Sequence, residues 1–325
     1  MLIRLIFWTL AGLSLLLLSG ALITWQHKLR VEARFPPVGH FFAVDGLRLH
    51  YQVRREAAPG AATLVFLHGA STNLRDFGPL LAALDGGSIG LVSVDRPGAG
   101  YSTQNRPDWV NPGLQADAIA ALQRELKLER AVWVGHSLAG SVVMAGLLRH
   151  GGEPGVSAGV LLAGAAYDWT GGVDLVNHLP AWPGLGPLLT HSVVTPMGLF
   201  ALNGGIRNAF APEPVTANYR ERSGIGLYLR PGQFAATARD VRLLSDYLRR
   251  QSEGYQGIEQ PVLIIHGAKD DIVPAWNHAD RLVKVLPRSV YYPIAGGGHQ
   301  PHHVHTDQVA DWIQAFTADL NDPRH

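Results

Sequence analysis

The sequence contains no cysteine, which excludes disulfide bonds, a thiol nucleophile and any metal site built on cysteine. Charge is also scarce: Lys, Arg, Asp and Glu make up 16% of the 325 residues, and the formal net charge is only +1. Such a balance gives no electrostatic reason to expect a nucleic-acid partner. Hydrophobic residues make up 47%, so the chain can bury a sizeable core, and its length suggests one large domain or two small ones.

The longest uncharged stretch lies at the N-terminus. Residues 5–25 are rich in leucine and carry no charge, and a helix of this length crosses a bilayer. An aromatic residue and then basic residues follow, as is typical of an anchor at a membrane interface. We therefore expect residues 1–30 to be a retained single-span membrane anchor. A cleaved signal peptide, with Ser19-Gly20-Ala21 as its cleavage site, is the alternative. Basic residues lie on both sides of the run, which leaves the orientation open.

Beyond residue 40, short apolar runs alternate with helical patterns. Runs typical of strands cover residues 41–44, 47–53, 63–67, 91–94, 132–134, 156–163, 262–265 and 289–293. The first two flank Asp45-Gly46, a favoured two-residue turn, and predict a hairpin. Helical spacing covers residues 112–127, 275–286 and 304–320. This alternation predicts an α/β fold, with a mostly parallel central sheet covered by helices on both faces.

The stretch with the clearest chemical signature runs from Ala131 to Gly140 and reads Ala-Val-Trp-Val-Gly-His-Ser-Leu-Ala-Gly. It predicts a strand, a very tight turn and a buried helix, with Ser137 at the apex of the turn. A residue there adopts a strained backbone conformation, so its neighbours must be small. The turn resembles the nucleophile elbow, Gly-x-Ser-x-Gly, of the α/β-hydrolase family, with Ala139 in place of the last glycine.

Two further loops at predicted strand ends are similar to loops of the same family. One is His68-Gly69-Ala70. Here the resemblance implies that the backbone amides of Ala70 and Leu138 form the oxyanion hole. We interpret His68 as a structural residue that braces this loop. Asp95 begins an Asp-x-x-Gly-x-Gly-x-Ser loop and is also interpreted as structural.

A serine hydroxyl is a poor nucleophile until a base, most often histidine, removes its proton. The resemblance implies the order Ser, Asp, His, with acid and base on loops after later strands. His299 follows three glycines, as in the family's histidine loop, and Asp270 matches the Gly-x-x-Asp position after the strand at 262–265. With Ser137 they form the predicted catalytic triad. Asp271 is the main rival for the acid, and we interpret it as a solvated or capping carboxylate.

Three histidines after the predicted base invite a metal interpretation. His302, His303 and His305 are close enough in sequence to chelate an ion, but no carboxylate cluster of recognised spacing accompanies them. We therefore expect no metal and no cofactor. Packing is expected for His266, and solvation for Lys269, Arg96 and the arginines of the segment described next.

Residues 167–257, between two predicted strands, have a different texture. Prolines and glycines break their first half, and their second half predicts an amphipathic helix over residues 233–250. So long an insertion is better interpreted as a small helical cap than as a loop. We call it the cap (residues 167–257); it divides the predicted core into residues 41–166 and 258–321. In the resembling family, insertions at this point form a lid over the active site.

Apolar groups at residues 179–182 and 197–202 of the cap either line an acyl pocket or form the cap's own core. The leading hypothesis is a serine hydrolase that cleaves an ester or related acyl bond of a small, hydrophobic substrate through an acyl-enzyme. A C–C bond hydrolase, a perhydrolase and a lyase use the same triad in the family. The alternative from another class is a non-catalytic, membrane-tethered binding protein. The expected partners are a small acyl substrate and a membrane, not nucleic acid.

Overall fold

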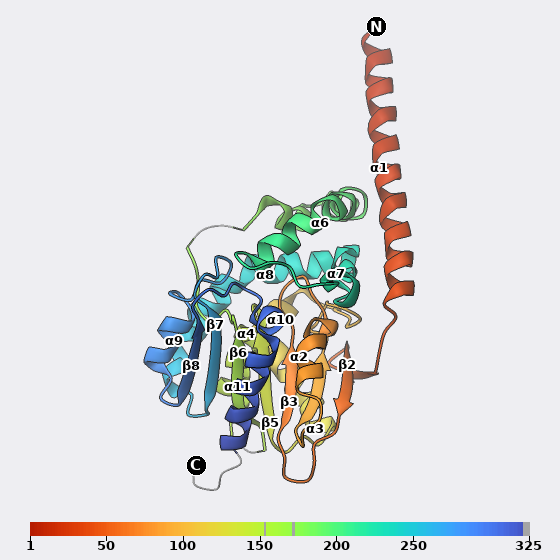
Figure 1. Cartoon of the computed structure of the whole chain (residues 1–325). Coiled ribbons are helices and arrows are strands. Elements are labelled where there is room, and N and C mark those ends of the chain that lie inside the picture. The colour runs from red at the N-terminus through yellow and green to blue at the C-terminus, as the bar shows by residue number, and fades with distance from the viewer. Residues whose placement is uncertain (153, 171–172, 321–325) are drawn as a thin grey trace.

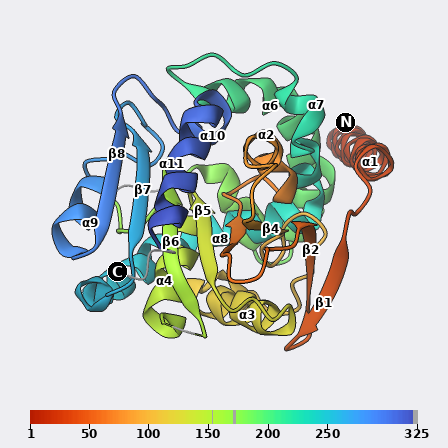
Figure 2. The same ribbon diagram turned by 60° about the horizontal axis from the view of Figure 1, so that its bottom comes forward.

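The computed structural model describes residues 1–152, 154–170 and 173–320, so residues 171–172 of the cap and the last predicted core residue, 321, lie outside it. Within these residues, the central sheet has eight strands in the order β1-β2-β4-β3-β5-β6-β7-β8 (Figures 1 and 2). The strands are β1 (His40–Val44), β2 (Leu47–Arg55), β3 (Thr63–Leu67), β4 (Gly90–Val94), β5 (Ala131–His136), β6 (Val156–Leu162), β7 (Val262–Gly267) and β8 (Ser289–Ile294). β1 and β2 pair antiparallel, as does β2 with β4, and the other neighbours are parallel. The predicted α/β fold with a mostly parallel sheet is confirmed.

Helices cover both faces of this sheet. One face carries α2 (Gly78–Ala83) and α11 (Thr306–Asp319), and the other carries α3 (Pro112–Glu125), α4 (Ala139–His150) and α9 (Ala279–Val285). In β3, Leu64 and Phe66 belong to the core under α2 and α11. Val65 and Leu67 belong to the core under α3, α4 and α9. Successive side chains of a strand point to opposite faces, so a strand buried on both faces is apolar throughout. This is why the sequence showed it as a continuous apolar run.

Two predicted helices have different bounds in the structure. The helix expected over residues 275–286 begins only at Ala279, because the preceding residues form turns in which the His278 ring accepts hydrogen bonds from the N–H groups of Ala166 and Tyr167, both at 3.1 Å. The helix expected over residues 304–320 is divided into α10 (Pro301–Val304) and α11, with His305 between them in a non-helical conformation.

The cap lies over the carboxyl ends of the parallel strands, where Figure 1 shows α6, α7 and α8 at the top of the sheet. Its elements are η3 (Leu175–Asn177), η4 (Leu179–Ala181), α5 (Gly186–Leu189), the π-helical turn η5 (Thr190–Val194), α6 (Thr195–Phe210), α7 (Tyr219–Arg222), η6 (Ile225–Leu229), α8 (Pro231–Gln251) and η7 (Ser252–Gly257). The expected helix over residues 233–250 is α8. The first half of the cap is more helical than its prolines suggested, because Pro196 occupies the first turn of α6, where a missing N–H leaves no bond unmade.

At the N-terminus, α1 (Leu2–Arg34) is a single long helix, and among the described helices it is the one long and apolar enough to cross a membrane. Its most apolar window has a mean hydropathy of 2.1 and is only 6% buried. The second half of α1 packs against the cap (Figure 1). A methyl group on Gly20 would overlap the backbone carbonyl of Ser192, and Nε2 of His27 lies 2.9 Å from the carbonyl oxygen of Gly226. The helix is therefore attached to the cap.

The close contact between α4 and the segment after β6 generates a prediction for Gly140. A Cβ at this position would lie 2.7 Å from Cα of Gly164 and 2.9 Å from the N of Ala165, both backbone atoms. We expect Gly140→Ala to lower the free energy of unfolding by about 1–3 kcal/mol through overpacking. The matched control is Gly232→Ala in the first turn of α8, where a Cβ would meet nothing within 4 Å. Denaturant unfolding should show no loss for this control, and equal effects of both variants would contradict the prediction.

Candidate active site

Ser137 lies at the turn between β5 and α4 with a φ of +53°, in the left-handed region that non-glycine residues rarely adopt. Its N–H donates to the carbonyl of Leu162 at 3.0 Å, and its own carbonyl accepts from the N–H groups of Gly140 and Ala165, both at 2.9 Å. Hydrogen bonds to the end of β6 thus hold the turn, so the strained conformation is maintained by its surroundings.

The Ser137 hydroxyl is beside His299, which follows β8 in the glycine-rich loop. Its Oγ is 2.9 Å from Nε2 of His299, and Nδ1 of the same ring is 2.8 Å from Oδ2 of Asp270, on the loop after β7. The three residues proposed from the sequence therefore form one hydrogen-bonded row. In such a row the imidazole can accept the hydroxyl proton while the carboxylate fixes the tautomer of the ring.

Asp270 is held on both of its oxygens. Oδ1 accepts the N–H groups of Ile272 and Val273, both at 2.9 Å, and Oδ2 also lies 3.3 Å from Nε2 of His266. Burial by itself would raise the pKa of Asp270, but the hydrogen bonds from His266 and His299 hold the pKa below its usual range. The carboxylate is therefore ionised near neutral pH.

Asp271, the rival acid, is in a different position. It is exposed, whereas Asp270 is only 4% exposed and its carboxylate makes the contact with His299. The geometry agrees with the choice of Asp270.

The loop after β3 brings a backbone amide to the same place. Ala70 lines the same cavity as Ser137 and packs against the buried apolar cluster that contains Leu138. Among the hydrogen bonds of the described residues, none is donated by the N–H of Ala70 or of Leu138, so both amides can bind a ligand. Arg96 holds this loop: its Nε donates to the carbonyl of His68 at 2.7 Å and its Nη2 to that of Gly69 at 3.0 Å.

The expectation that Arg96 is solvated is wrong, because its side chain is only 1% exposed. Its Nη1 donates to Oε1 of Gln115 and to Oδ2 of Asp240, both at 3.1 Å. The rigid fork of a guanidinium can serve several acceptors at once, which offsets the loss of water. Asp240 belongs to α8, so this ion pair joins the cap to the loop of Ala70. Arg230 of the cap is also buried rather than solvated.

Beneath the His299 loop lies a buried carboxylate that the sequence did not single out. Oδ1 of Asp76 accepts from the hydroxyl of Tyr219 at 3.2 Å and lies 3.1 Å from Nε2 of His303; Oδ2 lies 3.3 Å from Nε2 of His302. Burial opposes ionisation, but the nearby His303 and the hydrogen bonds from both rings hold the pKa of Asp76 well below its usual range. Burial, assisted by His303, lowers the pKa of His302 to about 4. The adjacent histidine pair was the one sequence signal that pointed here.

These side chains are also the ones that could hold a metal ion. Asp76, His136 and His302 offer ligand atoms that lie within 4.8 Å of one another. His136 also supports the loop of His299, since its Nε2 lies 3.0 Å from the carbonyl oxygen of His299. His305 lies apart from them and pairs with Glu213 at 2.6 Å. The absence of a metal stays a prediction.

A cavity of about 510 Å³ reaches Ser137, and most of its wall is apolar. Within the described chain, α6 contributes wall residues from position 197 to position 209. Four residues of the group at residues 197–202 line the cavity, namely Met197, Gly198, Ala201 and Leu202, whereas Leu179 of the group at residues 179–182 packs inside the cap. Space and polarity both suit an acyl chain beside the serine.

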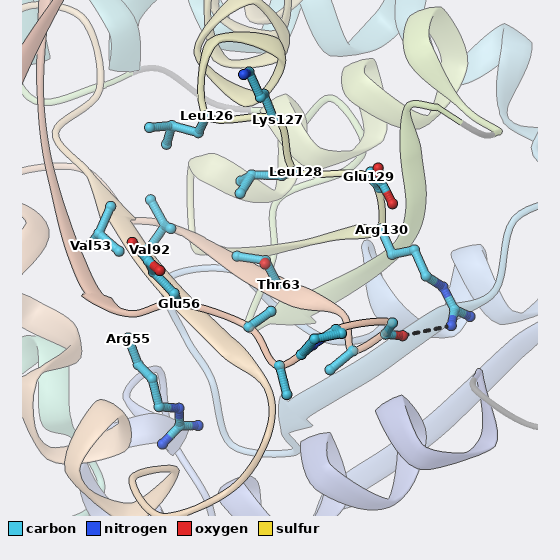
Figure 3. A pocket seen from close by; sticks show the side chains of 15 residues that line it. Val53, Arg55, Glu56, Thr63, Val92, Leu126, Lys127, Leu128, Glu129 and Arg130 are labelled. Atoms are coloured by element: carbon cyan, nitrogen blue, oxygen red, sulfur yellow. Dashed lines mark hydrogen bonds between the residues drawn. The ribbon is translucent and has the colours of Figure 1, made fainter.

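A second cavity, of about 430 Å³, lies at the opposite edge of the sheet (Figure 3). It is lined by residues at the amino ends of the strands, such as Thr63 and Glu129, and Arg130 crosses its side to donate to the carbonyl of Gly60 at 3.2 Å. Ser137, His299 and Asp270 lie at the carboxyl ends of the parallel strands, so this cavity is separate from their site.

Comparisons with known proteins agree with this geometry. A sequence profile described as "Alpha/beta hydrolase family" matches residues 64–312. The AB hydrolase superfamily protein YisY of Bacillus subtilis (strain 168) is 25% identical over 286 residues, which cover 86% of this chain and 99% of that protein. A solved membrane phospholipase A, described as a bacterial virulence factor, has a TM-score of 0.67 at 19% identity, covering 99% of this chain and 98% of its own. An esterase from Exiguobacterium antarcticum has a TM-score of 0.67 at 21% identity, covering 86% and 100%. The two structures show a shared fold.

The burial of Asp240 beside Arg96 predicts a pH dependence of stability. Burial, opposed by Arg96, raises the pKa of Asp240 from 3.8 to about 6. Between these values the unfolded chain has released a proton that the folded protein still holds, so raising the pH favours unfolding. Protonated Asp240 therefore contributes on the order of 3 kcal/mol to the free energy of unfolding at a pH below 3.8. This contribution is lost as the pH rises through the folded-state pKa of about 6.

We therefore expect Asp240→Asn to remove this loss. Thermal melting of both proteins in detergent should show the melting temperature of the native chain falling relative to that of the variant as the pH rises from 4 to about 6. Parallel curves over this range would contradict the raised pKa.

Proposed function

Because the chain belongs to the alpha/beta hydrolase family and is a hydrolytic enzyme, we propose that it is a serine hydrolase that cleaves an ester or related acyl bond through an acyl-enzyme. The observation that carries this proposal is the row of Ser137, His299 and Asp270, with contacts of 2.9 and 2.8 Å.

In the first half of the reaction, Oγ of Ser137 attacks the substrate carbonyl carbon while Nε2 of His299 accepts the hydroxyl proton. The negative charge that develops on the carbonyl oxygen is stabilised by the N–H groups of Ala70 and Leu138, and loss of one such donor typically costs about 10²–10³ in rate. Asp270, ionised and hydrogen-bonded to Nδ1, stabilises the imidazolium.

The acyl-enzyme forms when the C–O bond to the leaving group breaks and His299 returns its proton to the departing alkoxide. In the second half, a water molecule gives a proton to the same ring nitrogen and attacks the acyl carbon. Breakdown of this second tetrahedral intermediate releases the carboxylic acid, and the proton returns to Ser137. No step of this reaction requires a metal or a cofactor.

The apolar lining of the cavity supports a hydrophobic acyl group as the substrate's reacting part. We further propose that α1 anchors the enzyme in a membrane, since its uncharged run is long enough to span one. The membrane phospholipase A that shares this fold supports the idea of lipid-derived esters, although the likeness itself concerns the fold alone.

A fluorophosphonate probe tests the nucleophile. The folded protein should react at Ser137, because the probe phosphonylates a serine activated by a neighbouring base. Mass spectrometry of the peptides identifies the labelled residue, and Ser137→Ala should remove the label. A folded sample that stays unlabelled would overturn the proposal.

Asp270 and its neighbour Asp271 provide a matched pair of variants that tests which carboxylate is the acid of the triad. Asp270→Asn should lower kcat on p-nitrophenyl butyrate by about 10³–10⁴, because the ring of His299 loses the partner that fixes its tautomer. Asp271→Asn removes an exposed carboxylate from the next position and should leave kcat nearly unchanged. The reverse pattern would assign the acid to Asp271.

A further inference from the structure

The contact between α1 and the cap sets the height of the cap relative to a membrane. Trp25 ends the uncharged run, and the next charged residue is Lys28. Gly20, which touches the backbone of Ser192 in η5, precedes Trp25 by five residues, or ~7.5 Å along a helix that rises about 1.5 Å per residue. The surface of the cap at η5 therefore lies level with the apolar part of α1, not with its charged end.

The cap segment that meets the apolar part of α1 is uncharged. From residue 175 to residue 206 the sequence has no Lys, Arg, Asp or Glu, although these make up 16% of the chain. Large apolar side chains are exposed on both sides of η5. We call them the apolar cap surface: Leu175, Trp182, Leu185, Leu188, Met197 and Phe200. Phe200, at 94% exposed, makes almost no contact with the protein. Large exposed apolar side chains concentrated in one segment are typical of an interaction surface.

Charged side chains gather farther along α1. A groove of about 270 Å³ between α1 and the cap is lined by Arg30, Arg34 and Arg220, and also by Glu221. Nearby, Arg230 pairs with Glu32 at 2.9 Å. Apolar groups thus precede Trp25 along α1, and charged groups, most of them basic, follow it. The hydrocarbon of a leaflet and its phosphate layer succeed one another in the same order.

The cavity reaches the apolar cap surface at Met197. Met197 lines the cavity and is still 58% exposed, and Val176, another wall residue, is next to the exposed Leu175. An acyl chain that leaves a leaflet at this point meets apolar side chains along its way to Ser137. The cost of transferring the chain through water is then avoided.

From this register we propose that the apolar cap surface is immersed in the leaflet next to α1, and that the cavity takes the acyl chain of a membrane-resident ester lipid directly from that leaflet. The inference rests on the proposed function, because it assumes the anchor and a hydrolytic Ser137. It names the substrate class of that same site.

The absence of native cysteine allows a clean depth measurement. A spin label is attached to Phe200→Cys of the full chain, in nanodiscs of phosphatidylcholine and phosphatidylglycerol. The control is Val290→Cys, an exposed apolar residue at the amino end of β8, remote from the cap. Collision with oxygen reports on hydrocarbon, and collision with a water-soluble nickel chelate reports on water.

We expect the ratio of oxygen to nickel collisions to be several-fold higher at position 200 than at position 290. Equal ratios would overturn the proposal. Low collision with both reagents at position 200 would show that protein, such as a second copy, covers the surface, and would also overturn it. Intact mass confirms that residues 1–30 are retained in the sample, and fluorophosphonate labelling of Ser137 in the same nanodiscs tests the proposed function separately.

A functional measurement checks the second half of the inference. Phe200→Glu adds a charge to the apolar cap surface at a residue that does not line the cavity. It should lower turnover of a phospholipid in the nanodisc several-fold and leave turnover of soluble p-nitrophenyl butyrate unchanged. Val290→Glu should change neither rate. A Phe200→Glu variant that loses both activities equally, or neither, would contradict access from the leaflet.

Discussion

Parallel strands bring their carboxyl ends to one edge of a sheet, and the chemistry of this protein depends on that constraint. β3, β5 and β7 end at the loops of Ala70, Ser137 and Asp270, and β8 leads to His299. Residues separated by as many as 162 positions thereby come within 2.9 Å. The constraint has a cost, because polar groups at this edge lose water when the cap covers them. Asp76 and Asp270, both buried at this edge, are therefore surrounded by donors.

Much of the fold could be predicted because its strands obey a simple rule. A strand buried on both faces must be apolar at every position, so residues such as Leu64 and Val65 identify it without knowledge of its partners. The turn of Ser137 was predictable for a similar reason, since a strained backbone there admits only small neighbours. Both features are local in sequence, and local features are what a sequence displays.

The failures concern groups whose partners are distant. Arginine is mostly exposed in proteins, and the acceptors that make burial of Arg96 tolerable include Asp240, 144 residues farther on. Asp76 is likewise surrounded by histidines and a tyrosine from separate segments. In the cap, Pro196 was counted as a breaker although it stands in the first turn of α6. No pattern along the chain distinguishes a buried arginine or aspartate from an exposed one, or a proline in the first turn of a helix from one that ends a helix.

The pair of Arg96 and Asp240 has a mechanical consequence for the enzyme. Arg96 grips the carbonyls of His68 and Gly69, and α8 carries the carboxylate that completes its set of acceptors. Displacement of α8 would leave a buried cation short of its counterion and free to shift the strand end that carries Ala70. The position of α8 and the alignment of the Ala70 amide are then thermodynamically linked. By reciprocity, a ligand that steadies the cap also steadies the amide, and a ligand held by the amide steadies the cap.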